Sequence, residues 1–203
     1  MAEGDDAKSR TRITDPQVMR ALAHPARISI LEHLSSTGEG VTATQMAGLV
    51  DLSPSATSYH LRELARYHLV EQAPGRGDGR ERVWRSVSAG WNLDSDTDEP
   101  DVRAAGQELV DVYLSRDYAR IKDYFARQHE EPAPWRAAAT LMGKTLLLTV
   151  EELIEVNAAV NELLKPYERR RRVADPPAGA RAVAVHYATF PTGKGLPPAD
   201  MKE

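Results

Sequence analysis

The chain has 203 residues, of which 41% are hydrophobic and 28% are charged, and its formal net charge is −4. This composition suits a globular protein with one medium domain or two small ones, and it excludes a wholly disordered chain. Because the sequence contains no cysteine, disulfides, thiolate metal sites and thiol redox chemistry are excluded as well.

The location and the partners of the chain are constrained by its apolar runs and its charge distribution. No run approaches the roughly 18 apolar residues of a membrane span, and the polar start lacks the apolar core of a secretory signal, so we expect a cytoplasmic protein. The net negative charge does not exclude DNA binding, which needs only a local basic patch. Arginines outnumber acids over residues 53–85, whereas residues 94–131 are acidic.

The chain is expected to begin with a loose tail and two short helices. Residues 1–13 are small, polar and charged, which predicts a flexible tail. Asp15 and Pro16 predict a helix start, because aspartate is a good N-cap and proline suits the first helical position. That helix breaks at His24, since a residue before proline is pushed out of helical geometry. An aliphatic stripe then restarts a helix that ends near Gly38.

Two further helix starts follow in quick succession. Thr42 and Gln45 form a capping-box pattern, in which each side chain satisfies a backbone amide of the other residue. Ser53 and Pro54 then read as an N-cap and a first-turn proline, opening a helix that runs to about Tyr67. The gap of a few residues between them forces the second helix to cross the first sharply, which predicts a helix-turn-helix.

A β-hairpin is expected directly after this pair of helices. Residues 70–73 and 83–87 have strand character, and a glycine-rich, arginine-rich tip separates them. In this position the hairpin would be the wing of a winged helix-turn-helix domain covering residues 14–90. Residues 91–100 are acidic and end in a proline, so we predict a linker there.

The second half of the chain opens with a predicted long helix. Apolar residues keep helical spacing from 102 to 125, and Pro132 and Pro134 end the pattern. Apolar residues occupy more than one side of this helix, which favours a dimer contact; packing within its own subunit is the alternative.

A second, shorter helix is predicted near the C-terminus, between two extended stretches. Residues 136–148 read as an extended segment, and Thr149 with Glu152 forms another capping box that opens a helix to about residue 172. Residues 182–190 are rich in valine and aromatics, which suggests a strand.

The predicted fold class is therefore α+β: an N-terminal winged helix-turn-helix followed by a C-terminal extension of a long helix, a further helix and short strands. Residues 101–203 would form a dimerisation domain. This part of the chain could also bind an effector or a partner protein, and its residues do not choose between these roles.

The helix that begins near Ser53 has two distinct sides on a helical wheel. The side expected to face the core holds Thr57, Leu61, Leu64 and His68. The opposite side holds Ser55, Tyr59, Arg62 and Arg66. Short hydroxyls permit close approach to a DNA major groove, arginine can make paired hydrogen bonds to guanine, and the helix N-terminus can hold a phosphate.

These features define a set of candidate DNA-binding residues: Ser53, Ser55, Ala56, Thr57, Ser58, Tyr59, His60, Arg62, Arg66, Arg76, Arg80 and Arg82. His60 falls at the edge of the outer strip, so a structural role and a base contact both remain open for it. Each member alone could be an ordinary solvated residue. The order of caps, short turn, polar face and basic hairpin favours double-stranded DNA as the partner.

The same region resembles a known family. The sequences ALAHPARISIL (residues 21–31), LSPSATSYHLREL (residues 52–64) and HLV (residues 68–70) are similar to the ArsR-type winged-helix repressors. The resemblance implies a homodimer that represses genes from a palindromic operator. It also implies that the bases are read by Ser55, Tyr59, His60 and Arg62, with the wing represented by Arg76, Arg80 and Arg82.

The sequence departs from that family in two respects. Many such proteins sense metals through paired cysteines or through Asp/His sets on the last helix, but cysteine is absent here and the histidines lack regular helical spacing. We therefore expect no metal and no cofactor. The chain also continues for about a hundred residues beyond the wing.

The sequence also bears on two other classes of function. Catalysis is not expected, because no nucleophile motif of the Gly-x-Ser-x-Gly type and no phosphate-binding loop is present. The main alternative to DNA binding is a winged-helix module used for protein contact, with the acidic C-terminal half as its functional surface.

Overall fold

The computed structural model describes residues 10–73, 82–94 and 97–193. Four helices form the centre of the N-terminal half: α1 (Pro16–Leu22), α2 (Pro25–Thr37), α3 (Ala43–Val50) and α4 (Pro54–Arg66). The break between α1 and α2 falls at His24, as predicted. Its Nδ1 accepts a hydrogen bond of 3.2 Å from the amide of Ala26, so the residue that ends one helix caps the next.

A small antiparallel sheet carries the wing. It contains β2 (Val41–Thr42), β3 (Val70–Ala73) and β4 (Val83–Ser86) in the order β2-β4-β3. Val70 pairs with Ser86 and Ala73 pairs with Val83, which is the register of a hairpin. The predicted wing strands are therefore confirmed.

A second, two-stranded sheet was not predicted. Strand β1 (Arg10–Ile13) pairs in parallel with β5 (Gly90–Leu93), so residues assigned to the tail and to the linker are instead ordered together. Ile13 explains the difference, because its side chain is 2% exposed and anchors the strand against the core. An ion pair between Arg12 and Asp94 holds the outer side.

The hydrophobic core lies among α1, α2, α3, α4, strand β1, the wing strands and the start of the next helix. That helix, α5 (Pro100–Arg127), is the predicted long helix. Its first half packs on α1 through Val102, Ala105 and Leu109, which are all buried. Much of the apolar surface expected to serve dimerisation is thus used within the subunit.

The remaining elements form an open arrangement beyond α5. They are the short helices η2 (Gln128–Glu130), α6 (Ala133–Ala138), η3 (Lys165–Tyr167) and α8 (Arg169–Arg172), together with α7 (Val150–Leu164). The capping box of Thr149 and Glu152 is confirmed at the start of α7. The helix ends at Leu164 rather than near residue 172, because Pro166 cannot continue an α-helix.

The two extended stretches predicted in this half are only partly confirmed. The first starts later than expected, because α6 continues to Ala138. Residues 182–190 are extended but pair with no strand among the described residues, so they do not form the predicted strand. Valines and aromatics favour extended backbone, but a strand also needs a neighbour to complete its hydrogen bonds.

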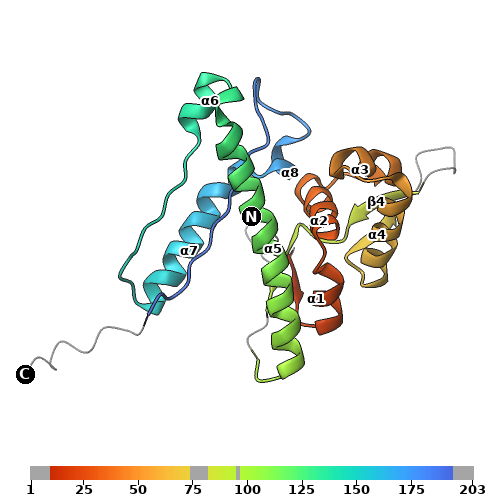
Figure 1. Ribbon diagram of the computed structural model, residues 1–203, viewed down its shortest axis with the longest axis horizontal. Helices are drawn as coiled ribbons and strands as arrows, with labels where there is room; N and C mark the ends of the chain where they lie inside the picture. Colours follow the sequence, from red (N-terminus) through yellow and green to blue (C-terminus); the bar gives the residue numbers. More distant parts are fainter. Residues whose placement is uncertain (1–9, 74–81, 95–96, 194–203) are drawn as a thin grey trace, which may run out of the picture.

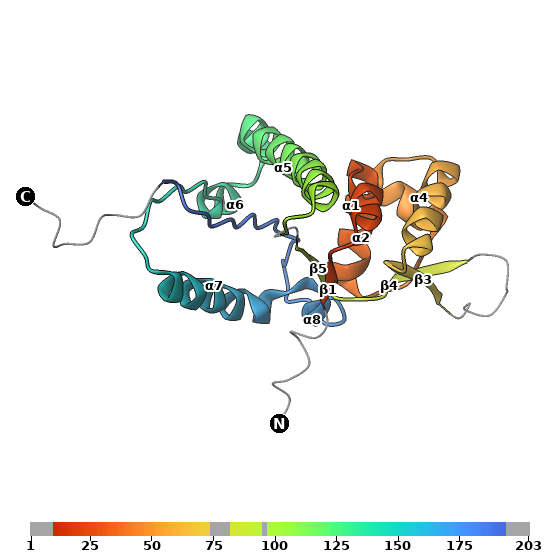
Figure 2. The same ribbon diagram turned by 90° about the horizontal axis from the view of Figure 1, so that it is seen from below.

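The two halves of the chain lie on opposite sides of α5. Figures 1 and 2 both show the helix-turn-helix elements on one side and α7, with its flanking extended chain, on the other. Beyond Leu109 no described residue is buried. No helix in the described ranges is long and apolar enough to cross a membrane.

Candidate nucleic-acid interface

The turn between α3 and α4 fixes the direction of the second helix. Thr42 Oγ1 accepts the amide of Gln45 at 3.2 Å, and Gln45 Oε1 accepts the amide of Thr42 at 2.9 Å, which confirms the predicted capping box. Asp51 adopts a left-handed conformation with φ 54°, and the amide of Leu52 returns to the carbonyl of Ala47 at 3.1 Å. This backbone reversal ends α3 within one turn.

The start of α4 is capped as the sequence predicts. Ser53 Oγ accepts the amide of Ala56 at 3.2 Å and lies 3.1 Å from Ser55 Oγ. Pro54 occupies the first turn, where its missing N–H leaves nothing unsatisfied. The remaining first-turn amides carry the positive end of the helix dipole, which favours an anion such as a DNA phosphate.

The outer face of α4 is polar and open to solvent. The exposed members of the candidate set are Ser53, Ser55, Tyr59, Arg62, Arg66 and Arg82, while Ala56 and Ser58 are half-buried. Within the described part of the chain, the Arg62 guanidinium makes no hydrogen bond or ion pair with another side chain. Its five N–H donors are thus open to an external acceptor.

Two of the candidate residues lie on the inner face of α4. Thr57 is 0% exposed and packs in the core, as the helical wheel placed it. His60 is 8% exposed, and its ring lies against the ring of His24 with centroids 4.6 Å apart. Both side chains are therefore buried on the inner side of α4 in this structure, which favours the structural role for His60, and the place of both residues in the DNA-binding set stays a prediction.

The end of α4 differs from the wheel at one position. His68 was expected on the core side, but it is exposed because α4 ends at Arg66 and the wheel does not extend beyond it. His68 has φ 56°, and its amide donates to the carbonyl of Ala65 at 3.0 Å. The amide of Leu69 reaches the carbonyl of Leu64 at 3.1 Å, which completes a Schellman-type C-cap.

The wing is held beside α4 by its strand pairing. Trp84 is 4% exposed and faces the core, whereas Arg85 lies opposite Glu71 across the hairpin and donates to it at 2.7 Å. The tip, with Arg76 and Arg80, lies outside the described residues. Arg82, at the base of the hairpin, is exposed.

A polar cluster supports α4 from behind. Burial lowers the pKa of His60, and the nearby charges of His24 and Arg27 lower it further. Burial and Arg27 also lower the pKa of His24. Among the described residues, His60 Nδ1 and Arg27 Nε are buried without a hydrogen-bond partner. Both histidines are therefore favoured in the neutral form behind the exposed face.

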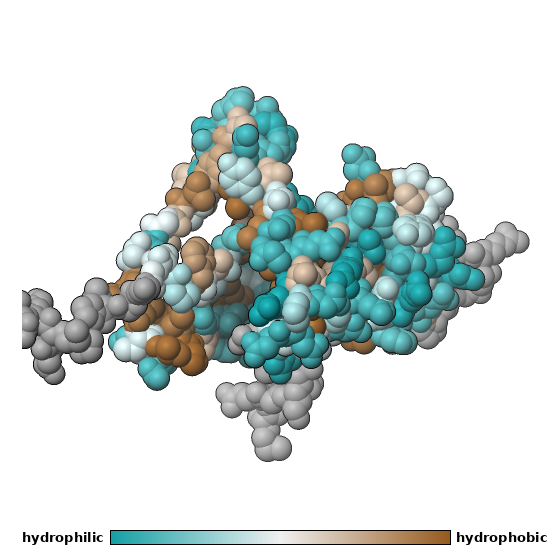
Figure 3. Space-filling model, turned by 60° about the horizontal axis from the view of Figure 1, so that its bottom comes forward, coloured by the Kyte–Doolittle hydropathy of each residue, from teal (hydrophilic) through white to brown (hydrophobic). Residues whose placement is uncertain are grey.

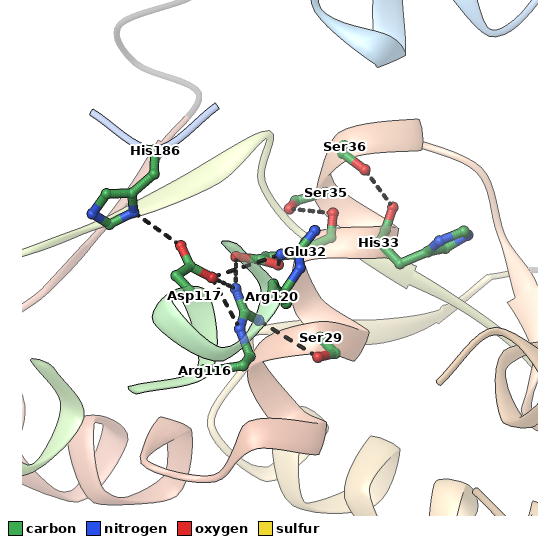
Figure 4. A network of polar contacts seen from close by, with 9 residues as sticks. All are labelled: Ser29, Glu32, His33, Ser35, Ser36, Arg116, Asp117, Arg120 and His186. Carbon is green, nitrogen blue, oxygen red and sulfur yellow. Dashed lines mark hydrogen bonds and ion pairs between the residues drawn. The ribbon is translucent and has the colours of Figure 1, made fainter. Parts of the chain in front are cut away.

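An ionic network joins α2 to α5 (Figure 4). Arg116, whose side chain is only 9% exposed, donates to Glu32 at 2.5 Å and to Asp117 at 2.8 Å. Asp117 also contacts His186 Nδ1 at 3.0 Å. Burial alone would raise the pKa of Asp117, but hydrogen bonds from Arg116 and His186 hold it below its usual value. Sequence reasoning missed this network, because its members are far apart in the chain.

Metal-binding chemistry has no structural support in the described residues. Within residues 10–73, 82–94 and 97–193, no group of three or more histidine, aspartate or glutamate side chains is arranged to hold a metal ion.

A polar hollow of about 550 Å³ lies between the wing base and α8, lined in part by Arg10, Arg85 and Arg170.

Comparison with known proteins gives one family match. Residues 22–73 match the family described as "Helix-turn-helix domain", a span that covers α2, α3, α4 and β3. No curated protein was found to match the chain.

Several solved structures are similar to this chain at low identity. YusO from Bacillus subtilis is 15% identical, with 73% of this chain and 79% of that chain covered and a TM-score of 0.32. ZitR from Lactococcus lactis, a zinc-responsive MarR family member, is 13% identical, with 70% and 74% covered and a TM-score of 0.31. The homodimeric winged helix-turn-helix DNA-binding domain of Mb0332 from Mycobacterium bovis, a possible ArsR-family regulator, is 20% identical, with 57% and 87% covered and a TM-score of 0.30.

Proposed function

We propose that this chain, whose residues 22–73 match a helix-turn-helix domain family, is a winged-helix transcriptional regulator of the ArsR-like type and acts as a dimeric repressor on a palindromic operator. Members of this class are typically not enzymes. The finer proposal concerns which residues read the DNA, how the second copy contributes and what binding does to transcription.

The proposal depends above all on the exposed face of α4. Leu61 and Leu64 are fully buried and seat the helix on the core, so the opposite side must point outward. That side carries Ser55, Tyr59 and Arg62 in exposed positions. A helix with a buried aliphatic side and an outer side of hydroxyls, an aromatic ring and arginine fits a major groove.

The candidate residues divide into base-reading and phosphate-binding groups. We propose that Arg62 makes the paired base contact, with Ser55 and Tyr59 beside it. Phosphates would be held by Ser53 with the first-turn amides, by Arg66 and by the wing arginines. The wing group is the predicted set Arg76, Arg80 and Arg82.

A second copy of the chain completes the proposed reading of the operator. One α4 in one groove contacts only a few base pairs, whereas a two-fold dimer places two such helices about one helical turn of DNA apart. A dimer covering a promoter excludes polymerase, and repression follows from that occupancy.

The test compares three variants on two DNA duplexes. The specific duplex is obtained by footprinting the DNA upstream of the protein's own gene, and the second is random. We expect Arg62→Ala to weaken specific binding by about 1–3 kcal/mol, or roughly 5- to 150-fold, with little change on random DNA. Arg80→Ala should weaken both alike and reduce the salt slope by about one. Arg103→Ala, an exposed arginine on α5, is the control and should change neither.

Two outcomes would contradict the proposal. Equal losses on both duplexes for Arg62→Ala would remove that residue from the base-reading group. If the affinity for random DNA did not change with salt concentration, phosphate contacts would not contribute to binding. In that case the winged helix would serve protein contact, which is the alternative raised by the sequence.

A further inference from the structure

The polar hollow between the wing base and α8 is built from four separate parts of the chain. Its walls come from β1, the C-terminal end of α2, the wing strands with the loop that follows them, and α8. Figure 2 shows α8 next to β1 and the base of the wing. The volume of about 550 Å³ lies within the roughly 300–1,000 Å³ typical of small-molecule sites. A small ligand in the hollow would therefore contact both halves of the chain at once.

The lining of the hollow carries an excess of positive charge. Arg10, Arg85 and Arg170 line it, whereas Glu71 is the one acid among the described residues that do so. The hollow is therefore positive in a chain whose formal net charge is −4. Figure 3 shows mostly hydrophilic residues over the helix-turn-helix half of the molecule, so a ligand would be recognised through charge and hydrogen bonds rather than through apolar contact.

Neighbouring residues hold the arginines in place. Arg85 Nε and Nη2 both lie 2.7 Å from Glu71 Oε1, so this acid pairs with one edge of the guanidinium and the edge with Nη1 is turned away from it. The stem of Arg10 lies along Gly90, with Cγ and Nε 3.7 Å from the place of a Cβ there. Arg170 belongs to α8, which packs on α2. Side chains that are already positioned lose less conformational entropy when an anion binds.

Hydroxyl groups fix the loop that forms one wall of the hollow. Ser86 Oγ donates to the carbonyl of Ser88 at 2.7 Å, and Ser88 Oγ donates to the carbonyl of Gly90 at 2.8 Å. Thr11 Oγ1 of β1 donates to Ser88 Oγ at 2.9 Å, which joins the loop to β1. Val87 belongs to this loop, lines the hollow and is 53% exposed. This wall is therefore in place before any ligand binds.

The hollow lies on the outer face of the wing sheet. Successive side chains of a strand point to opposite faces. Trp84 is 4% exposed and packs in the core with Leu61 and Leu64 of α4, so Arg85 points to the opposite face of the sheet. A phosphate bound in the hollow would therefore belong to a separate molecule and not to the DNA that α4 is proposed to read.

We propose that this hollow binds a small organic phosphate ester. A phosphate monoester carries about −1.5 to −2 charges near pH 7 and three acceptor oxygens, which suits three arginines and one acid that come from different segments. A carboxylate has one charge and two oxygens in a plane, and a single arginine fork satisfies it. The site goes beyond the proposed repressor role and does not depend on it, because its ligand binds away from the proposed DNA-reading face.

The experiment is isothermal titration calorimetry of the full chain with glycerol 3-phosphate at fixed ionic strength. The wild type should bind this ester saturably, bind succinate at least about tenfold more weakly, and give no binding heat with glycerol. Arg85→Ala and Arg170→Ala should each reduce the affinity for the ester by about tenfold or more, because each removes a charge-assisted hydrogen bond. Arg103→Ala, at an exposed position of α5 outside the hollow, is the control and should keep the wild-type affinity.

A matched pair at Val87 separates charge from shape. Val87→Glu places a carboxylate in the hollow, and Val87→Gln places a neutral side chain of nearly the same size there. The position is exposed, so both variants should fold with the circular dichroism of the wild type. Val87→Glu should weaken binding of the ester by about tenfold or more, because like charges repel, whereas Val87→Gln should stay within about twofold of the wild type.

Four outcomes would overturn the proposal. The first is a wild type that shows no saturable binding of the ester, and the second is equal affinity for succinate. The third is wild-type affinity in Arg85→Ala, Arg170→Ala and Val87→Glu together, which would place the bound phosphate elsewhere. The fourth is weaker binding of Arg170→Ala to random DNA with unchanged affinity for the ester, which would assign the hollow to DNA. The titration contains no DNA, so its failure leaves the repressor proposal to its own test.

Discussion

Replacing Thr57 with valine tests whether α4 is seated as described. Thr57 is 0% exposed, and its hydroxyl is buried without a hydrogen-bond partner among the described residues. Valine has nearly the same shape and keeps β-branching, so the packing of the helix should be preserved. The substitution therefore removes a buried, unsatisfied polar group and little else.

The expected gain in stability follows from that geometry. Burying an unpaired hydroxyl costs about 1–3 kcal/mol, and part of that cost is offset by local relaxation, so we expect Thr57→Val to raise the free energy of unfolding by about 1 kcal/mol. For a chain of this size, 1 kcal/mol corresponds to a Tm increase of about 2–4 °C. Calorimetry gives the Tm, and fluorescence anisotropy on the operator gives the dissociation constant, which should not change.

Either of two results would refute this reasoning. A lower Tm would mean that the hydroxyl has a partner whose loss matters. A dissociation constant that rises severalfold on the operator but not on random DNA would mean that Thr57 contributes to DNA binding, as its place in the predicted DNA-binding set implies. Ser55→Ala, at an exposed position of the same helix, is the comparison for a true loss of DNA contact.

Three other changes test the residues that hold α4 and the wing in place. Gly40→Ala should lower the Tm, because the added Cβ would lie 2.7 Å from Val83 Cγ1 at the wing base; an unchanged Tm would mean that Val83 moves freely. Ser53→Ala should cost about 1 kcal/mol of stability in urea titration, since it removes the N-cap of α4, and restoration by Ser53→Asp would assign that loss to the cap. The pKa of His60 is lowered in the fold, so the unfolded chain binds the proton first and stability should fall as pH drops below about 6.5. His60→Phe keeps a ring against His24 and should flatten that decline; an equally steep decline would assign it to other groups.

The elements that were predicted well depend on residues close together in sequence. The capping boxes of Thr42 with Gln45 and of Thr149 with Glu152 each span one helical turn, so the sequence contains both partners side by side. The turn before Ser53 is equally local. Such signals set where helices begin, and the order of the helices then determines the helix-turn-helix.

The features that were missed depend on partners distant in sequence. Strand β1 was assigned to the tail because its partner, β5, begins 80 residues later and gives no local signal. Arg116 finds Glu32 across a similar separation. The role of His60 stayed open in the sequence for the same reason, since its ring packs against His24, which lies outside α4.

The length of α5 gives the chain a rigid connection between its two halves. Twenty-eight helical residues make a rod of about 42 Å. The first half of α5 packs on α1, and the ion pairs around Arg116 join its middle to α2. A molecule that binds the C-terminal half and tilts the C-terminal end of α5 would therefore also move the helices that support α4. If two copies bind DNA as proposed, that motion would change the distance between their two α4 helices, which must match the pitch of DNA.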